Sequence, residues 1–213
     1  RYDLEKSLQA LGTDHIDIYF YHRDDLKRPV GELLEQMEVF RKEGKILYYG
    51  CSNWTTSRMI EADAYAKSHG ITGFVANQNL YNIAAQHMKP FEDDTMVCVD
   101  EEAIRFYQTS NNTPMPYFSI CSGFFHHLAA KGDDAVKNSC YYTPENLKLA
   151  RGLQTLCKKY GCSTQALLGF FYVQAYPIVP LVGFSKISQL EDALNSVHIP
   201  FTQEDYVEIG GIQ

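Results

Sequence analysis

The sequence predicts an α/β protein whose strands run parallel to one another. Along the 213 residues, apolar positions switch repeatedly between the alternation of a strand and the spacing of a helix. Strands that alternate with helices in this way pair in parallel through right-handed crossovers. Apolar residues make up 45% of the chain, enough for a substantial core, and no Pro/Gly/Ser-rich linker interrupts it. We therefore expect one domain over residues 1–213.

The first half of the chain contains three predicted strands. Leu4, Leu8 and Leu11 lie at helical spacing ahead of Gly12, which indicates the end of a helix. Strands are then expected at 15–22, 46–52 and 73–79, with helices at 30–45 and 56–70 between them. The helix at 30–45 carries apolar residues on one face and stops at a glycine. The apolar residues are Leu33, Leu34, Met37 and Phe40, and the stop signal is Gly44.

The second half contains two more predicted strands. An irregular connection over 80–99 precedes a helix at 100–110 and a strand at 114–120. Helices at 145–161, opened by Pro144, and at 164–174, capped by Ser163, precede a strand at 178–184 and a helix at 188–197. Five strands fit an open doubly wound sheet or part of an eight-stranded barrel. The helix that begins the chain favours a barrel with earlier strand–helix units missing.

Composition narrows the class of protein. The net charge of −7 and pI of about 5.5 disfavour nucleic acid or an anionic membrane as the main partner. No run of 18 apolar residues is present, so we expect no membrane span. The six cysteines form no C-x-x-C or zinc-type pattern, which indicates reduced thiols and a cytoplasmic location.

Polar side chains of several kinds occupy the predicted carboxyl ends of the strands, where parallel α/β proteins bind ligands. In chain order these ends are 22–25, 51–54, 77–79, 118–120 and 183–186. An imidazole, hydroxyls, amides, an aromatic ring and a lysine suit a planar, amide-bearing ligand with an anionic tail. These side chains suit a metal ion less well, because a metal site needs several histidines or carboxylates on different strand ends.

Five segments resemble motifs of the aldo/keto reductase family, in the same order. The segments are LQALGTDHIDIYFYHRDD, GKILYYGCSNW, NQNLYN, PYFSICSGFF and PLVGFSKISQLEDAL. The first resembles the segment that ends on the family's catalytic histidine. The next three resemble its Gly-x-Ser-Asn, Gln-x-x-Tyr-Asn and Tyr-Ser-Pro-Leu-x-x-Gly motifs. The fifth resembles its last strand and the loop that holds the cofactor tail.

The resemblance implies a (β/α)8 TIM barrel that transfers hydride between NADPH and a carbonyl or alcohol. The chain then corresponds to strands 4 to 8, about five strand–helix units of an incomplete barrel. The implied activity is that of an NADP(H)-dependent oxidoreductase acting on a small aldehyde, ketone or sugar, with NAD as a possible alternative cofactor.

Positions in the motifs imply individual roles. His22 matches the histidine that orients the substrate carbonyl and stabilises the developing oxyanion. The implied cofactor contacts are Ser52, Asn53 and Gln78 on the carboxamide, Phe118 stacked on the nicotinamide, Ser119 and Gly123 below the pyrophosphate, and Gly183, Ser185, Lys186 and Gln189 at the adenosine end. Phe118 replaces the usual tyrosine but keeps the stacking face. Lys186 on the 2′-phosphate favours NADPH. Ala193 departs from the family's usual asparagine.

The resemblance also implies that part of the site is missing. The family's catalytic aspartate, proton-donor tyrosine and lysine lie on earlier units, and no tyrosine here matches the donor. We therefore expect the 213-residue chain to lack reductase activity by itself. Unpaired sheet edges predict self-association or completion by the missing N-terminal strands.

Each role has a structural alternative. His22 can simply mark the surfacing of a core strand, and Ser52–Asn53 can cap the helix that begins near Thr55. Gln78 can be a structural amide, Phe118 a core aromatic and Lys186 a solvated lysine. Two other functions also stay open. One is a dinucleotide-binding sensor on the same barrel; the other is a metal-dependent hydrolase that uses His22 with neighbouring carboxylates, although no metal is expected.

Overall fold

The computed structural model describes residues 1–163 and 165–212. Four parallel strands form one sheet in the order β1 (Ile16–Tyr21), β2 (Ile46–Ser52), β3 (Ala76–Gln78) and β4 (Thr113–Pro114). The helices are α1 (Tyr2–Leu11), α2 (Val30–Lys42), α3 (Thr56–His69), α4 (Glu101–Thr109), α5 (Phe124–Lys131), α6 (Pro144–Tyr160), α7 (Gln165–Tyr172), α8 (Ile187–Asn195) and α9 (Gln203–Glu208). The predicted α/β class with parallel pairing is confirmed.

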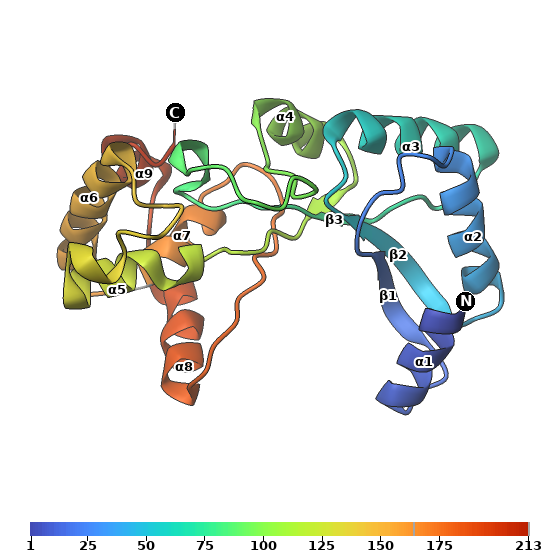
Figure 1. Cartoon of the computed structure of the whole chain (residues 1–213), viewed down its shortest axis with the longest axis horizontal. Coiled ribbons are helices and arrows are strands. Elements are labelled where there is room, and N and C mark those ends of the chain that lie inside the picture. Colours follow the sequence, from blue (N-terminus) through green and yellow to red (C-terminus); the bar gives the residue numbers. More distant parts are fainter. Residues whose placement is uncertain (164, 213) are drawn as a thin grey trace.

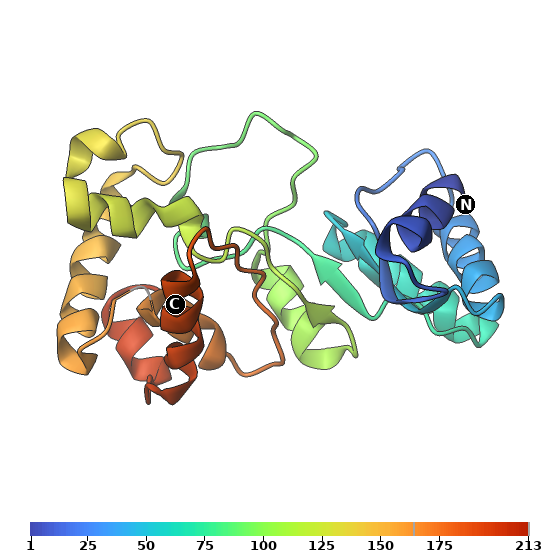
Figure 2. The same ribbon diagram turned by 90° about the horizontal axis from the view of Figure 1, so that it is seen from below.

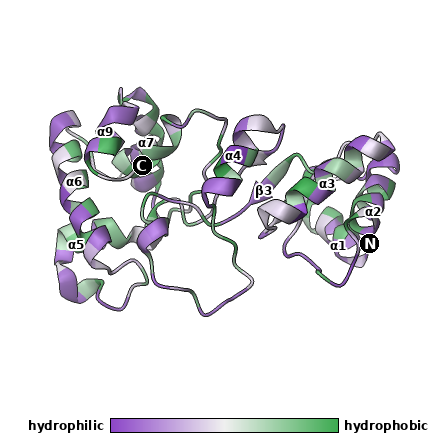
Figure 3. Ribbon diagram, turned by 90° about the horizontal axis from the view of Figure 1, so that it is seen from above, coloured by the Kyte–Doolittle hydropathy of each residue, from purple (hydrophilic) through white to green (hydrophobic). Residues whose placement is uncertain are grey.

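The sheet extends from one helical group toward a second. In Figure 1, β1, β2 and α1 to α3 occupy one side and α5 to α9 the other, with β3 and α4 between them. Each side has its own apolar core, and Phe106 on α4 packs against both. Figure 2 shows the connection from β3 to α4 as a wide loop between the two sides. Hydrophobic and hydrophilic residues alternate along helices such as α3 and α6 in Figure 3, so each helix presents an apolar stripe.

The fifth predicted strand, at 178–184, is absent from the described residues, and the strand predicted at 114–120 is reduced to β4. Val179 and Leu181 donate backbone hydrogen bonds to the carbonyls of Pro114 (3.0 Å) and Pro116 (2.8 Å), so the two segments do lie in parallel. A ladder also needs bonds in the return direction, and Pro116 has no N–H. At Phe118 the backbone turns to a φ of 56°, which ends any extension of β4.

The strand predicted at 15–22 forms as β1, but it is not the core strand that its apolar residues indicated. Within the described residues β1 pairs only with β2, so it is an edge strand of an open sheet. Ile18 on β1 is 37% exposed and Tyr48 on β2 is 50% exposed. Both apolar side chains therefore lie on parts of the sheet that the described residues leave partly uncovered.

Two helices were not predicted, α5 and α9. Helix α5 follows three consecutive residues with positive φ, Cys121, Ser122 and Gly123, in a segment where no periodic pattern indicated a helix or strand. Helix α9 is capped by Thr202, whose hydroxyl accepts a hydrogen bond from the Asp205 backbone N–H at 3.3 Å. The predicted helix at 164–174 begins at Thr164, which lies outside the described residues. Its described part is α7.

Asp205 on α9 predicts a pH-dependent contribution to stability. It is 3% exposed and accepts hydrogen bonds from Lys159 Nζ (2.6 Å), Tyr160 Oη (2.8 Å) and the Thr202 backbone N–H (2.9 Å). Burial opposes ionisation, but these donors, led by Lys159, lower the pKa of Asp205 to about 2. Because an unfolded aspartate has a pKa of about 3.9, the ionised carboxylate stabilises the fold above about pH 4, and this contribution is lost as the pH falls toward 2.

We expect the urea midpoint of the wild-type chain to fall more steeply between pH 4 and pH 2 than that of Asp205→Asn. Urea titrations followed by circular dichroism at several pH values measure both slopes. Equal slopes would show that Asp205 does not carry this dependence.

No helix among residues 1–163 and 165–212 has the length and apolar character needed to cross a membrane.

Candidate functional site

His22, Ser52 and Gln78 lie on the same face of the sheet, at the carboxyl ends of three adjacent strands. Phe20 is paired with Gly50, and Ser52 with Gln78. Side chains alternate along a strand, so His22, one residue beyond β1, shares the face of Phe20 and Ser52. On this face a Cβ at Gly50 would lie 2.5 Å from the Phe20 ring, which therefore covers the glycine. His22 is exposed, and its ring forms no hydrogen bond with the described residues.

Asn53 forms the centre of a hydrogen-bond network behind this face. Its Oδ1 accepts from Tyr117 Oη (2.6 Å) and the Val97 backbone N–H (3.0 Å), and its Nδ2 donates to Ser52 Oγ (3.1 Å). Ser52 Oγ donates in turn to the Gln78 carbonyl at 2.8 Å. Burial raises the pKa of Tyr117 to about 12, so its hydroxyl stays a donor at neutral pH. The network joins the ends of β2 and β3 to the segments that follow.

Unlike the Asn53 amide, the Gln78 side-chain amide takes no part in the hydrogen-bond network. It is half-buried, and its amide has no hydrogen-bond partner among the described residues. The neighbouring amides Asn77 and Asn79 are both buried and donate to the Trp54 carbonyl, each at 3.1 Å. Of the three, Gln78 alone keeps a free amide facing the open side of the sheet.

Thr55 caps helix α3, which removes the capping alternative for Ser52 and Asn53. The Thr55 hydroxyl accepts a hydrogen bond from the Arg58 backbone N–H at 3.4 Å. Asn53 itself has a φ of 59°, a left-handed conformation that asparagine tolerates better than most residues. Its role in the structure is thus to turn the chain and to hold Ser52 in place.

Asp24 anchors the loop that follows His22. Arg58 on α3 donates to both carboxylate oxygens of Asp24, from Nε at 2.8 Å and from Nη2 at 3.0 Å. The side chains are 8% and 14% exposed, and the guanidinium lies 5.0 Å from the Trp54 ring centroid. This carboxylate is therefore committed to an ion pair, which weakens the hydrolase alternative that would use it beside His22.

Phe118 presents part of its ring to solvent. It is 39% exposed, and its backbone carbonyl accepts a hydrogen bond from Asn82 Nδ2 at 3.0 Å. The Phe91 ring stacks on it, with 5.7 Å between centroids and 15° between planes. The Tyr117 ring meets it edge-on at 5.4 Å. Phe118 is thus a half-covered aromatic platform and not a core residue.

Two adjoining hollows, of about 520 and 570 Å³, bring together most of the predicted cofactor residues. The first is lined by Phe118, Ser119, Gly123, Gly183, Ser185 and Gln189, among others. The second shares Gly123, Ser185 and Gln189 and adds Lys186. We call the two together the groove. Ser119 lines it with a buried side chain whose hydroxyl donates to the Pro116 carbonyl at 2.9 Å.

The groove does not include every predicted residue. His22, Ser52, Asn53 and Gln78 stand at the sheet end instead. The two groups are connected because the Tyr117 N–H donates to the Asn79 carbonyl at 3.1 Å, which places Phe118 next to the end of β3.

Gln189 shapes the far end of the groove. Its Oε1 accepts from the backbone N–H groups of Ser185 (3.0 Å) and Lys186 (3.1 Å) and closes the turn before α8. The Lys186 side chain is exposed and forms no ion pair with the described residues. Lys186 therefore places a positive charge at the edge of the groove that no carboxylate of the described residues pairs with.

Sequence reasoning missed three aromatic side chains of this region. Phe91 lies in the connection before α4, where no periodic pattern singled it out. His126 and His127 both line the second hollow of the groove. They lie on α5, with ring centroids 5.6 Å apart. The described residues contain no group of three or more His, Cys, Asp or Glu that could hold a metal ion.

Comparison with known proteins identifies the family. The sequence matches the aldo/keto reductase family over residues 1–213. The chain belongs to the aldo/keto reductase family. Among curated reductase relatives, the uncharacterized oxidoreductase YrpG of Bacillus subtilis is 26% identical, with 96% of this chain and 60% of that protein covered. The probable aryl-alcohol dehydrogenase AAD4 of Saccharomyces cerevisiae is also 26% identical, with 95% and 62% covered.

A further aldo/keto reductase relative is norsolorinic acid reductase B of Aspergillus parasiticus, 26% identical over 96% of this chain and 53% of that protein. A crystal structure of the thermostable aldo-keto reductase Tm1743 with the inhibitor epalrestat superposes with a TM-score of 0.71. It is 21% identical, with 97% of this chain and 63% of that chain covered, and it shows the shared fold. The chain thus spans about three fifths of the length of the first two curated relatives.

Proposed function

We propose that this chain forms the cofactor side of an NADP(H)-dependent site that transfers hydride between nicotinamide and a carbonyl or alcohol. The observation that carries the proposal is the placement of His22, Ser52 and Gln78 on one face of the sheet, beside the groove. Family membership supports the reaction class.

The residues present fit such a cofactor. The free amide of Gln78 can pair with a carboxamide, and the exposed part of the Phe118 ring offers a face for a planar heterocycle. The unpaired Lys186 amine offers a charge to a phosphate. When bound, the cofactor supplies or accepts the hydride.

The chain's own residues then bind and orient. His22, whose ring has no hydrogen-bond partner among residues 1–163 and 165–212, is free to donate a hydrogen bond to the substrate oxygen and to stabilise negative charge there. Ser52 and Asn53 bind the carboxamide as a unit, because Asn53 fixes the Ser52 hydroxyl and keeps a second Nδ2 hydrogen for the ligand. Ser119 and Gly123 line the part of the groove that would hold the pyrophosphate. Gly183 and Ser185 line the part that would lead to the adenosine.

We extend the proposal to substrate class and to completion of the site. Several relatives are named aryl-alcohol dehydrogenases, and Phe91 stacked on Phe118 provides aromatic surface at the sheet end. An aldehyde or ketone carrying an aromatic ring is therefore proposed, with sugars as the second class. The proton donor is proposed to come from outside residues 1–213, through further barrel strands or a second chain. The six free thiols fit a reducing cytoplasm.

Gln78→Ala tests the proposal. The wild-type chain is expected to bind NADPH, followed by the fluorescence of the cofactor, without oxidising it in the presence of benzaldehyde. Losing the free amide should weaken binding about tenfold, the effect of one hydrogen bond of 1 to 1.5 kcal/mol. Gln36→Ala, on the exposed face of α2, is the matched control. Equal affinities for the two variants would overturn the assignment, and benzaldehyde turnover would place the proton donor within this chain.

Lys186→Ala is expected to reduce the preference for NADPH over NADH several-fold, because the cation at the groove edge would otherwise pair with the 2′-phosphate. The affinities for both cofactors are measured by the same titration. Lys148→Ala, an exposed lysine on α6, should leave the ratio unchanged. A ratio unaltered in Lys186→Ala would mean that another group selects the phosphate.

A further inference from the structure

Cys157 and Cys162 flank the turn that ends α6. Gly161 adopts a left-handed conformation with a φ of 63°, and the Cys162 N–H donates to the Cys157 carbonyl at 3.0 Å. This pattern brings the residue before the turn and the residue after it side by side. Disulfides need Cα atoms about 4.4 to 6.8 Å apart, and a turn closed by a direct hydrogen bond between the two residues favours such a short separation.

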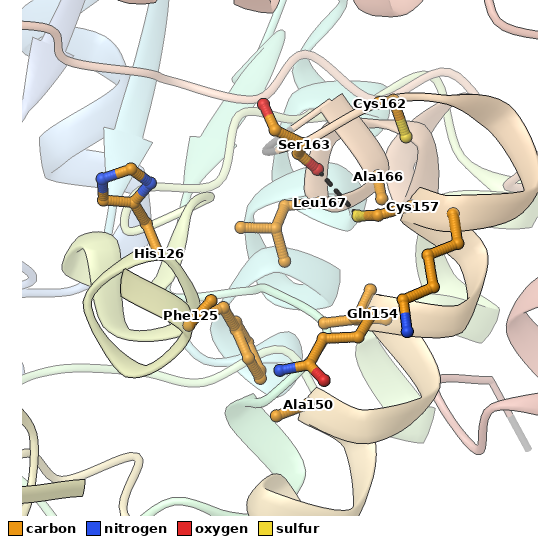
Figure 4. A pocket seen from close by; sticks show the side chains of 12 residues that line it. Phe125, His126, Ala150, Gln154, Cys157, Cys162, Ser163, Ala166 and Leu167 are labelled. Carbon is orange, nitrogen blue, oxygen red and sulfur yellow. Dashed lines mark hydrogen bonds between the residues drawn. The ribbon is translucent and has the colours of Figure 1, made fainter. Parts of the chain in front are cut away.

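The two thiols are close together and accessible. The direct backbone hydrogen bond between the two residues holds them side by side, and both residues are partly exposed. Both line a mainly apolar pocket of about 370 Å³ between α5, α6 and α7, shown in Figure 4. The Cys157 thiol donates to the Ser163 carbonyl at 3.1 Å, as the dashed line in that figure marks. A small oxidant can therefore reach the sulfurs through the pocket.

We propose that Cys157 and Cys162 form a dithiol site that hydroperoxides oxidise to an intramolecular disulfide. The Cys162 thiolate attacks one oxygen of hydrogen peroxide, which breaks the O–O bond and gives a sulfenic acid and hydroxide, and the hydroxide takes up the proton that the thiol released and becomes water. The Cys157 sulfur then attacks the sulfenyl sulfur, forms the S–S bond and releases a second water. Overall, two thiols and one hydrogen peroxide give one disulfide and two waters.

The other cysteines are less suited to this reaction. Cys51 and Cys121 have no exposed surface. Cys140 lies near enough to affect the pKa of Cys121, but burial of Cys121 keeps an oxidant from that pair. Cys98 and Cys140 are partly exposed and serve as internal references for non-selective oxidation.

The surroundings of the two sulfurs set the order and rate of the steps. Burial raises the pKa of Cys157 to about 12. Burial also raises the pKa of Cys162, but the neighbouring Cys157 thiol partly offsets that rise. The Cys157 thiol also donates its proton to the Ser163 carbonyl, which favours the protonated form, so we assign the attack to Cys162. Because the thiolate is the reactive form, the oxidation rate should rise about tenfold between pH 7 and pH 8.

Peptide mapping of the reduced 213-residue chain after treatment with hydrogen peroxide tests the proposal. Free thiols are blocked by alkylation before digestion with trypsin. Cleavage after Lys158 and Lys159 separates the cysteines, so their disulfide joins peptide 152–158 to peptide 160–186. We expect this cross-linked species to exceed any other cysteine pair at least tenfold and to disappear after reduction.

Cys157→Ser and Cys162→Ser should each abolish the cross-link, and Cys98→Ser should leave it unchanged. If a serine variant fails to fold, the wild-type map still decides. Overoxidation of both residues without the cross-link, or equal cross-linking among all accessible cysteines, would overturn the proposal. A formation rate independent of pH would also contradict the thiolate mechanism.

Discussion

Replacement of Asp24 by alanine is expected to lower the free energy of unfolding by about 3 kcal/mol, the loss that follows when one partner of a buried ion pair is removed. The Arg58 guanidinium would keep its place over the Trp54 ring but lose both charge-assisted bonds. Its remaining carboxylate partner, Glu61 at 3.2 Å, is largely solvent-exposed and compensates little. Urea denaturation followed by circular dichroism measures the difference.

Asp25→Ala is the matched control, because it removes the same charge from the adjacent position. Asp25 faces Arg28 at 3.5 Å, with more than half of each side chain exposed. The variant should therefore lose less than about 1 kcal/mol. Similar losses for the two variants would indicate that the charge of the loop matters, and not the buried pair with Arg58.

The strand–helix alternation was predictable because it depends on local patterns. Helix α2 has an apolar face, and α3 and α6 end at Gly70 and Gly161, both in the left-handed conformation that glycine adopts at little cost. These signals lie within a few residues of one another. They do not depend on what the helix packs against.

The extent of the sheet was not predictable from the same patterns. Residues 178–184 have the apolar character of a strand, yet the partner segment contains Pro116, which cannot return a hydrogen bond. Burial of β1 likewise depends on a neighbour on its free edge. Both outcomes depend on residues far away in the sequence, which a local pattern does not contain.

The candidate site likewise has one part that local patterns predicted and another part that they did not. Strand ends and motif order pointed to His22, Ser52 and Gln78, and the register places them on one face. The motif gave Asn53 and Gln78 the same role, but the fold uses the first amide internally and leaves the second free. Phe91 reaches Phe118 across 27 positions of the chain, a contact that no spacing rule predicts.

Asn53→Ala is expected to destabilise the chain by about 3 kcal/mol, from two sources. A left-handed conformation costs alanine about 1 to 2 kcal/mol, and loss of the buried amide leaves the Tyr117 hydroxyl and the Val97 N–H without their acceptor, at about 1 to 2 kcal/mol more. Since Asn53 also fixes the Ser52 hydroxyl, NADPH binding should weaken along with stability. Urea denaturation and the cofactor titration measure the two effects.

Asn53→Gly separates the two sources, because glycine adopts a φ of 59° freely but has no side chain to accept the hydrogen bonds. It should lose about half as much stability as alanine, while weakening NADPH binding to a similar degree. Equal destabilisation by alanine and glycine would mean that the backbone conformation contributes little. Unchanged NADPH affinity in both variants would show that the ordered Ser52 hydroxyl is not needed to hold the carboxamide, leaving Gln78 as the group that selects it.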